Sequence, residues 1–78
     1  MKTTHYFDAT RQRADRADIQ DAWVLYAIRS PVKEVVQSDG RTRRWAPIAD
    51  AGGRFLRVVL LEDGETVHNA FFDRGFTP

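Results

Sequence analysis

Apolar residues follow two different periods along this chain, and the change of period divides it into a helical part and a strand part. Between Asp15 and Arg29 the apolar residues recur at every third or fourth position, which is the spacing of one face of an α-helix. Asp15 is a favourable N-cap residue, and Ser30 before Pro31 ends the pattern because the residue before a proline avoids the helical region. The sequence therefore predicts one main helix over about residues 15–29.

After the proline, apolar and polar residues alternate, which is typical of strands with one buried face. Glycine-containing connections separate the alternating segments: tight turns at Asp39-Gly40 and Asp63-Gly64, and a loop of small residues at 49–53. Four strands are predicted, at about 32–37, 42–48, 55–61 and 66–72. Together with the helix they indicate an α+β fold in which the helix packs on a four-stranded antiparallel sheet.

The first eight residues contain β-branched and aromatic types, which favours an edge strand or an extended arm at 1–8. A chain of 78 residues is expected to form one domain. It has no cysteine, and its two histidines lack metal-ligand spacing, so we predict neither a metal nor a cofactor. No apolar run is long enough to span a bilayer and no signal-peptide pattern is present, so we expect a cytoplasmic protein without membrane contact.

The turn at 63–64 fixes which residues of the last two strands face each other. With this turn, Val59 opposes His68, and Arg57 becomes the diagonal neighbour of His68 on the same face. The alternate positions form an apolar face: Leu56, Val58, Leu60, Val67 and Phe71. A cation and an imidazole on the other face suggest a site for an anionic ligand.

Apolar matching also predicts the register between the second and third strands. Pairing Ile48 with Phe55 places Trp45 on the apolar face, where a large aromatic side chain would be buried. The same pairing brings Arg44 to the opposite face, beside the cation and the imidazole. A slip by one residue would exchange Arg44 for Arg43 and expose Trp45.

The distribution of charged residues is more informative about the ligand than the net charge of the chain. The formal net charge is +1, which by itself does not indicate a nucleic-acid-binding protein. Ten of the twelve basic residues are arginines. The densest group lies at 41–44, and two more arginines follow at 54 and 57. Arginine is the residue whose planar guanidinium binds phosphate or carboxylate at two points. The arginines therefore strengthen the case for an anionic ligand.

Three segments carry a resemblance to a known class of protein: DGRTRRW at 39–45, RFLRVV at 54–59 and DGETVHNAFFDR at 63–74. They resemble small bacterial domains of unknown function that are often regarded as toxins of toxin–antitoxin pairs. The order of a buried helix before an antiparallel sheet is similar to the RelE and BrnT ribonuclease toxins. The resemblance covers most of residues 15–72. It implies cleavage of messenger RNA, often on the ribosome, and a small antitoxin protein as partner.

The resemblance also assigns roles to residues. His68 would be the general acid or base, and Arg57 and Arg44 would hold the phosphate in the transition state. Three further arginines would bind the flanking RNA backbone: Arg41, Arg43 and Arg74.

A structural role competes with each of these assignments. His68 is explained equally well as a half-buried imidazole bonded to a neighbour. Arg57 has the alternative of extending to a carboxylate such as Glu34 or Asp73, and the arginines at 41–44 that of a solvated strand end. A second class of function also stays open, a non-catalytic protein-binding module or homodimer whose interface is the apolar part of the open face: Phe55, Val59, Leu61 and Phe72.

Overall fold

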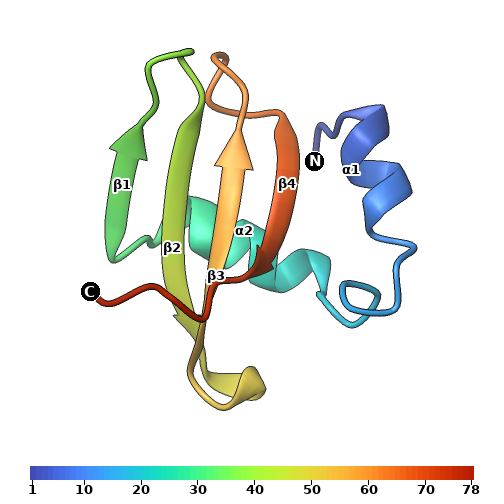
Figure 1. Ribbon diagram of the computed structural model, residues 1–78, viewed down its shortest axis with the longest axis vertical. Coiled ribbons are helices and arrows are strands. Elements are labelled where there is room, and N and C mark those ends of the chain that lie inside the picture. The colour runs from blue at the N-terminus through green and yellow to red at the C-terminus, as the bar shows by residue number, and fades with distance from the viewer.

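The computed structural model describes residues 1–78 and contains two α-helices and one four-stranded sheet (Figure 1). The helices are α1 (His5–Thr10) and α2 (Asp21–Arg29). The strands are β1 (Lys33–Val36), β2 (Thr42–Ile48), β3 (Arg54–Leu60) and β4 (Val67–Phe72), with the short 3-10 helix η1 (Ala49–Ala51) between β2 and β3. The predicted α+β class and the four strands are confirmed.

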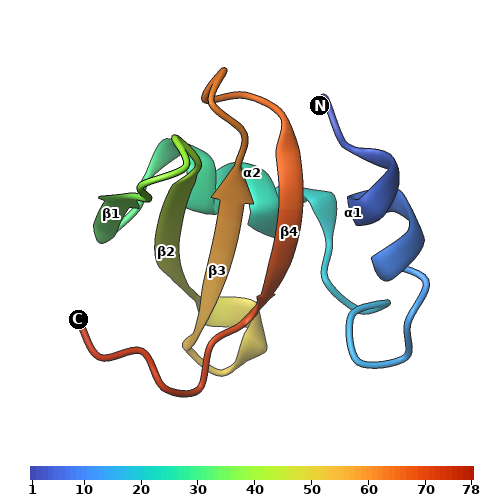
Figure 2. The ribbon, with the colours of Figure 1, turned by 45° about the horizontal axis from the view of Figure 1, so that its top comes forward.

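The strands lie in the order β1-β2-β3-β4, each antiparallel to its neighbour. Helix α2 crosses one face of the sheet, and α1 lies beside β4, at the edge opposite β1 (Figures 1 and 2). We call the sheet face away from α2 the open face. Residues 73–78 run from the end of β4 towards β1 (Figure 1). Neither helix has the length and apolar composition that crossing a membrane requires.

The hydrophobic core lies between α2 and the sheet. Leu56, Val58 and Leu60 alternate along β3, and all three are fully buried. Val24 and Ala27, three residues apart on α2, are fully buried against them. The two periods seen in the sequence thus bring their apolar residues into a single cluster.

The N-terminal residues form a helix instead of the predicted edge strand or arm. Thr4 is the N-cap of α1, and its hydroxyl accepts a hydrogen bond from the N–H of Phe7 at 3.1 Å. Phe7 is buried in the core, which holds this short helix against β4. A single bridge between Thr3 and Val67 is the only strand-like pairing of this segment.

The main helix begins at Asp21, six positions after the predicted start. Asp15 does not cap it, but lies in an exposed turn with its carboxylate 3.2 Å from Arg13. Residues 11–18 contain no large apolar side chain, so no packing stabilises a helix there. Ile19 is the first buried residue after this stretch, and α2 follows it directly.

The register between β2 and β3 differs from the predicted one by one residue. Ile48 pairs with Arg54 and not with Phe55. Trp45 therefore lies on the open face and not on the face of α2. It is nevertheless only 6% exposed, because Phe76 stacks on its ring with the centroids 4.9 Å apart. The large aromatic is buried, as expected, but by the C-terminal segment.

A β-bulge interrupts the pairing of β3 with β4. Leu60 pairs with Val67 as predicted, but Val59 pairs with Asn69. His68 is thereby left as the additional residue of β4, so the predicted pairing of Val59 with His68 is wrong.

Beyond the bulge, the two faces of β4 are exchanged relative to the prediction. Phe71 pairs with Arg57 on the open face. Phe72 turns to the other face and makes an edge contact with Trp23 of α2, with ring centroids 6.1 Å apart. Phe72 is therefore not available on the open face as a contact for a partner.

Candidate functional site

Two rows of side chains cross the open face, each with one residue from every strand. The first row is Lys33, Trp45, Arg57 and Phe71, and the second is Val35, Arg43, Val59 and Asn69. Directly opposite residues of an antiparallel pair have Cβ atoms about 4.5–5.5 Å apart, so neighbours in a row are in contact range. The first row, which we call the cation–aromatic row, alternates cationic and aromatic side chains.

Arg57 lies in the middle of the cation–aromatic row. Its guanidinium carbon is 5.1 Å from the ring centroid of Phe71 and 5.7 Å from that of Trp45. Nη1 lies 3.7 Å from Oδ2 of Asp73, and Trp45 Nε1 donates a hydrogen bond to the same oxygen at 3.0 Å. Desolvation lowers the pKa of Arg57, and the charge of Arg43 lowers it further, while Asp73 acts in the opposite direction. Asp73 is thus the carboxylate that Arg57 reaches.

Arg43 is the basic residue of β2 that shares the open face with Arg57. With its amide oxygen turned towards Arg43, Gln37 accepts hydrogen bonds from Nη2 at 2.9 Å and from Nε at 3.3 Å. Arg43 has no carboxylate partner. Lys33, whose Nζ lies 6.0 Å from the ring centroid of Phe76, has none either. The face therefore carries unneutralised positive charge.

The bulge residue His68 contacts the N-terminal segment. Its Nδ1 lies 3.1 Å from the hydroxyl of Thr4, and its ring stacks on Tyr6 with the centroids 4.9 Å apart. Burial lowers the pKa of His68, and the charge of Arg41 lowers it further. Both effects favour the neutral form of the imidazole. This environment matches the predicted alternative of a partly buried histidine bonded to a neighbour.

Arg44 lies on the face that carries α2, apart from the other two predicted catalytic residues. Its Nε donates to Oε2 of Glu34 at 2.6 Å, and its Nη1 donates to the carbonyl oxygen of Ile28 at 2.9 Å. Ile28 belongs to the last turn of α2, whose carbonyls lack partners within the helix. Because the observed register differs from the predicted one by one residue, Arg43 and not Arg44 shares the open face with Arg57.

The remaining predicted residues lie at the margins of the face. Arg41 precedes β2, and its Nε is 3.8 Å from the carboxylate of Asp39. Arg74 follows β4 and lines a hollow of about 240 Å³ together with Arg54 and the rings of Phe55, Phe72 and Phe76. The start of β2 and the end of β4 lie at opposite ends of the sheet, so Arg41 and Arg74 are apart and the three arginines predicted to bind substrate do not form one cluster.

Arg16 is a basic residue that sequence reasoning did not include. Its Nη1 donates to Oδ1 of Asn69 at 2.6 Å, and its guanidinium carbon lies 5.3 Å from the ring centroid of Phe71. It reaches the edge of the face from a turn 53 positions earlier in the chain. No local pattern in the sequence marks that contact.

No group of three or more potential metal ligands gathers anywhere in the structure. No protein-family model matches this chain, and no curated protein or solved structure matches it either. Its function has to be inferred from the geometry of its own residues.

Proposed function

We propose that the open face binds single-stranded RNA and that the protein is an RNA-directed toxin of a toxin–antitoxin pair, with a fold of the RelE and BrnT kind. The observation that carries this proposal is the cation–aromatic row, with Arg43 beside it in the second row. Arginine binds phosphate through paired charge-assisted hydrogen bonds, and aromatic rings stack on unpaired bases. Phe76 covers the ring of Trp45, so a base would stack on Phe71 or take the place of Phe76. Surfaces that bind single strands combine these two contacts.

The charges on this face support an anionic ligand. Arg43 and Arg57 are close enough for Arg43 to lower the pKa of Arg57, so they repel each other. A phosphate placed between them would relieve this repulsion. The Nε of Arg57 is also buried without a hydrogen-bond partner, which leaves its guanidinium only partly satisfied by Asp73.

Cleavage of the bound RNA would use His68 as the general base. With its ring proton on Nδ1, donated to the hydroxyl oxygen of Thr4, His68 has an unprotonated Nε2 that would take the proton of a 2′-hydroxyl. The 2′-oxygen would then attack the adjacent phosphorus and form a 2′,3′-cyclic phosphate, while the bond to the 5′-oxygen of the next nucleotide breaks and that oxygen takes the proton held on Nε2 of His68. Arg43 and Arg57 would stabilise the charge that develops on the phosphate oxygens.

The positive charge of the open face would also suit an acidic antitoxin as partner. A small protein with an acidic segment would cover Arg43, Arg57 and Lys33 and exclude RNA from them. Messenger RNA or the ribosome would be the target, which places the activity in the bacterial cytoplasm.

The test compares two neighbouring arginines of β2 that point to opposite faces. Binding of a fluorescein-labelled single-stranded RNA is measured by anisotropy at several salt concentrations. We expect Arg43→Ala to weaken binding by about fivefold to tenfold and to lower the salt slope by about one, as for loss of one phosphate contact. Arg44→Ala is the matched control, because it removes the same charge from the other face. Equal loss in both variants contradicts the proposed site.

The toxin part of the proposal needs a test in cells. Induction of the wild-type chain alone should arrest growth and degrade messenger RNA, and His68→Ala and Arg57→Ala should each relieve the arrest. Growth arrest without RNA degradation would leave RNA binding but remove the ribonuclease step. Unimpeded growth with the folded wild-type chain contradicts the toxin assignment.

A second candidate function, a non-catalytic homodimer or protein-binding module, is favoured by the edge strand β1. Every residue of β1 is exposed, and its outer edge has no partner strand. Val32, Val35 and Val36 are 53%, 37% and 65% exposed along it. Such an edge can accept a strand from another chain. A stable dimer that neither binds nor cleaves RNA would favour this function over the first.

A further inference from the structure

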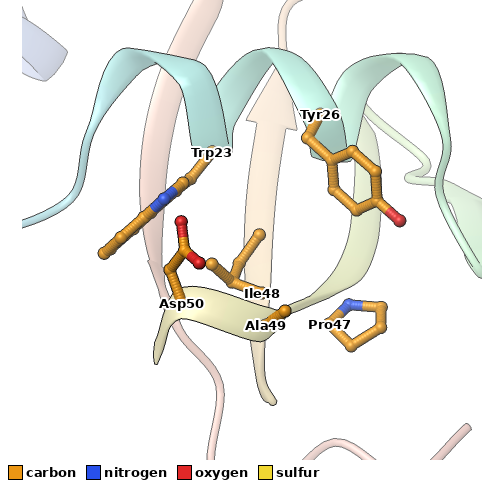
Figure 3. A pocket seen from close by; sticks show the side chains of 6 residues that line it. All are labelled: Trp23, Tyr26, Pro47, Ile48, Ala49 and Asp50. Atoms are coloured by element: carbon orange, nitrogen blue, oxygen red, sulfur yellow. The ribbon is translucent and has the colours of Figure 1, made fainter. Parts of the chain in front are cut away.

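A cleft of about 340 Å³ lies between α2 and the chain that leaves β2, on the side of the sheet away from the open face (Figure 3). Trp23 and Tyr26 extend into it from α2. Residues three apart on a helix lie on the same face, so both rings reach the cleft from α2, and in Figure 3 they lie on its two sides. The remaining lining residues are Pro47, Ile48, Ala49 and Asp50.

The two rings differ in how many contacts they make with the rest of the protein. Trp23 is fixed by its edge contact with Phe72, at an interplanar angle of 61°. Tyr26 is 49% exposed, so about half of its side chain is accessible to a ligand. The fold therefore uses part of the Trp23 ring, which packs against the core and Phe72, and leaves about half of Tyr26 accessible in the cleft.

A single carboxylate faces these rings. Asp50 is the middle residue of η1, and in Figure 3 its carboxylate points towards α2, between Trp23 and Tyr26. Asp50 is exposed and forms no ion pair with any basic residue of the chain. An unpaired anion between two aromatic rings is suited to a cation, because the ring faces and the carboxylate attract it together.

We propose that this cleft binds an arginine or lysine side chain of a partner polypeptide. The carboxylate of Asp50 complements the charged end of such a side chain. Four of the six lining residues are hydrophobic, which suits the aliphatic stem and the flanking residues of a peptide better than a small free cation. The open face and the cleft thus select ligands of opposite charge, and binding in the cleft does not depend on RNA binding.

The probe is the peptide acetyl-Gly-Arg-Gly-amide, compared with the same peptide carrying citrulline, which has nearly the same shape without the charge. Each is titrated into the ¹⁵N-labelled full-length protein. We expect the arginine peptide to shift the indole N–H of Trp23 and the backbone N–H of Ala49 and Asp50. The citrulline peptide should bind at least about threefold more weakly, as for loss of one exposed charge pair.

Three variants localise the effect. Asp50→Asn keeps the side-chain shape and should weaken the arginine peptide by about threefold to fivefold, and Tyr26→Leu should weaken it by a similar factor. Glu62→Gln removes a carboxylate at the opposite end of β3 and should leave the affinity unchanged. The amide spectra of the free variants show directly whether each has kept its fold.

Several outcomes would overturn the proposal. Equal affinity for the arginine and citrulline peptides would mean that the cleft does not recognise charge. Equal affinity for methylguanidinium alone would mean that no polypeptide is recognised. Shifts centred on Asp39 and Asp63 would place the peptide on another acidic surface.

Discussion

The guanidinium of Arg57 and the carboxylate of Asp73 lie 3.7 Å apart on the open face, with about one-fifth of each side chain exposed (22% and 20%). The carboxylate also accepts the indole N–H of Trp45. Asp73 therefore neutralises the central cation of the cation–aromatic row and orients it between two rings. The charge that Arg57 presents to a ligand depends on this one carboxylate, whereas Arg43 and Lys33 have no carboxylate partner.

Asp73→Asn should raise the affinity for RNA by about twofold to fivefold, because it removes a negative charge beside the proposed phosphate site. The amide oxygen can still accept the indole hydrogen bond, so the free energy of unfolding should fall by only about 1 kcal/mol. Anisotropy and urea unfolding measure the two effects. Glu65→Gln is the control, because its carboxylate pairs with Lys2 at an exposed turn. Weaker RNA binding by Asp73→Asn would contradict a phosphate site at Arg57.

The pKa of His68 should be measurable as a low titration midpoint in the native state. Burial and the charge of Arg41 lower this pKa from its ordinary value of 6.5. The unfolded chain then binds the proton more readily, so His68 contributes stability above pH 6.5 that is lost as the pH falls through the native pKa. NMR titration of the ring should give a midpoint below 6.5, and Arg41→Gln should raise it. A midpoint at or above 6.5 would show that the imidazole is not desolvated.

Asp63 should stay ionised far into the acid range. The hydroxyl and the N–H of Thr66, together with the N–H of Glu65, donate to its carboxylate and lower its pKa to about 2. Because this pKa lies below the ordinary 3.8, the turn is stabilised above pH 3.8 and loses that stability as the pH falls towards 2. Carboxyl ¹³C titration measures the midpoint. Thr66→Val removes the hydroxyl and should move the midpoint upward, and a wild-type midpoint near 4 would contradict the hydrogen-bonded turn.

Arg44 should matter for stability and not for RNA. Arg44→Ala removes a partly buried ion pair with Glu34 and the hydrogen bond to the last turn of α2, and should lower the free energy of unfolding by about 2 kcal/mol. Arg43→Ala, on the open face, should change it by less than about 0.5 kcal/mol. Urea unfolding of the two variants is the measurement. The reverse order of stabilities would mean that the register between β2 and β3 is the one predicted from the sequence.

The sequence predicted the features of the fold that depend on local periodicity. Alternation along 55–61 correctly placed Leu56, Val58 and Leu60 in the core, because a strand has only two faces and one is covered by α2. It also gave the bounds of β2 correctly. The start of α2 was missed, because a capping residue such as Asp15 is favourable only when apolar residues follow within the first turns.

The register and the candidate site depend on residues distant in the chain. Trp45 was assigned to the face of α2 because burial was expected there, but Phe76 from the C-terminal segment covers it on the other face. The bulge at His68 likewise has partners 64 and 62 positions earlier, Thr4 and Tyr6, which no strand pattern indicates. A shift of the register by one residue determines whether Arg43 or Arg44 lies on the open face with the proposed site.

Phe76 covers the ring of Trp45. Without Phe76, the cation–aromatic row would offer this ring surface to a base. The two rings are nearly parallel, at 12°, and Phe76 also makes an edge contact with Phe55. Phe76→Ala should lower the free energy of unfolding by about 1–2 kcal/mol and shift the tryptophan fluorescence to longer wavelength, since Trp45 becomes exposed. If bases stack on the row, the same variant should bind RNA about threefold more tightly, by removing a competitor for the ring.

Thr77→Ala changes an exposed neighbour in the same segment and should alter none of these quantities. Phe76→Ala with the expected loss of stability but unchanged or weaker RNA binding would show that Trp45 only supports the sheet. The RNA would then contact the face through its arginines and Lys33, and the affinity would follow salt concentration without any dependence on base stacking.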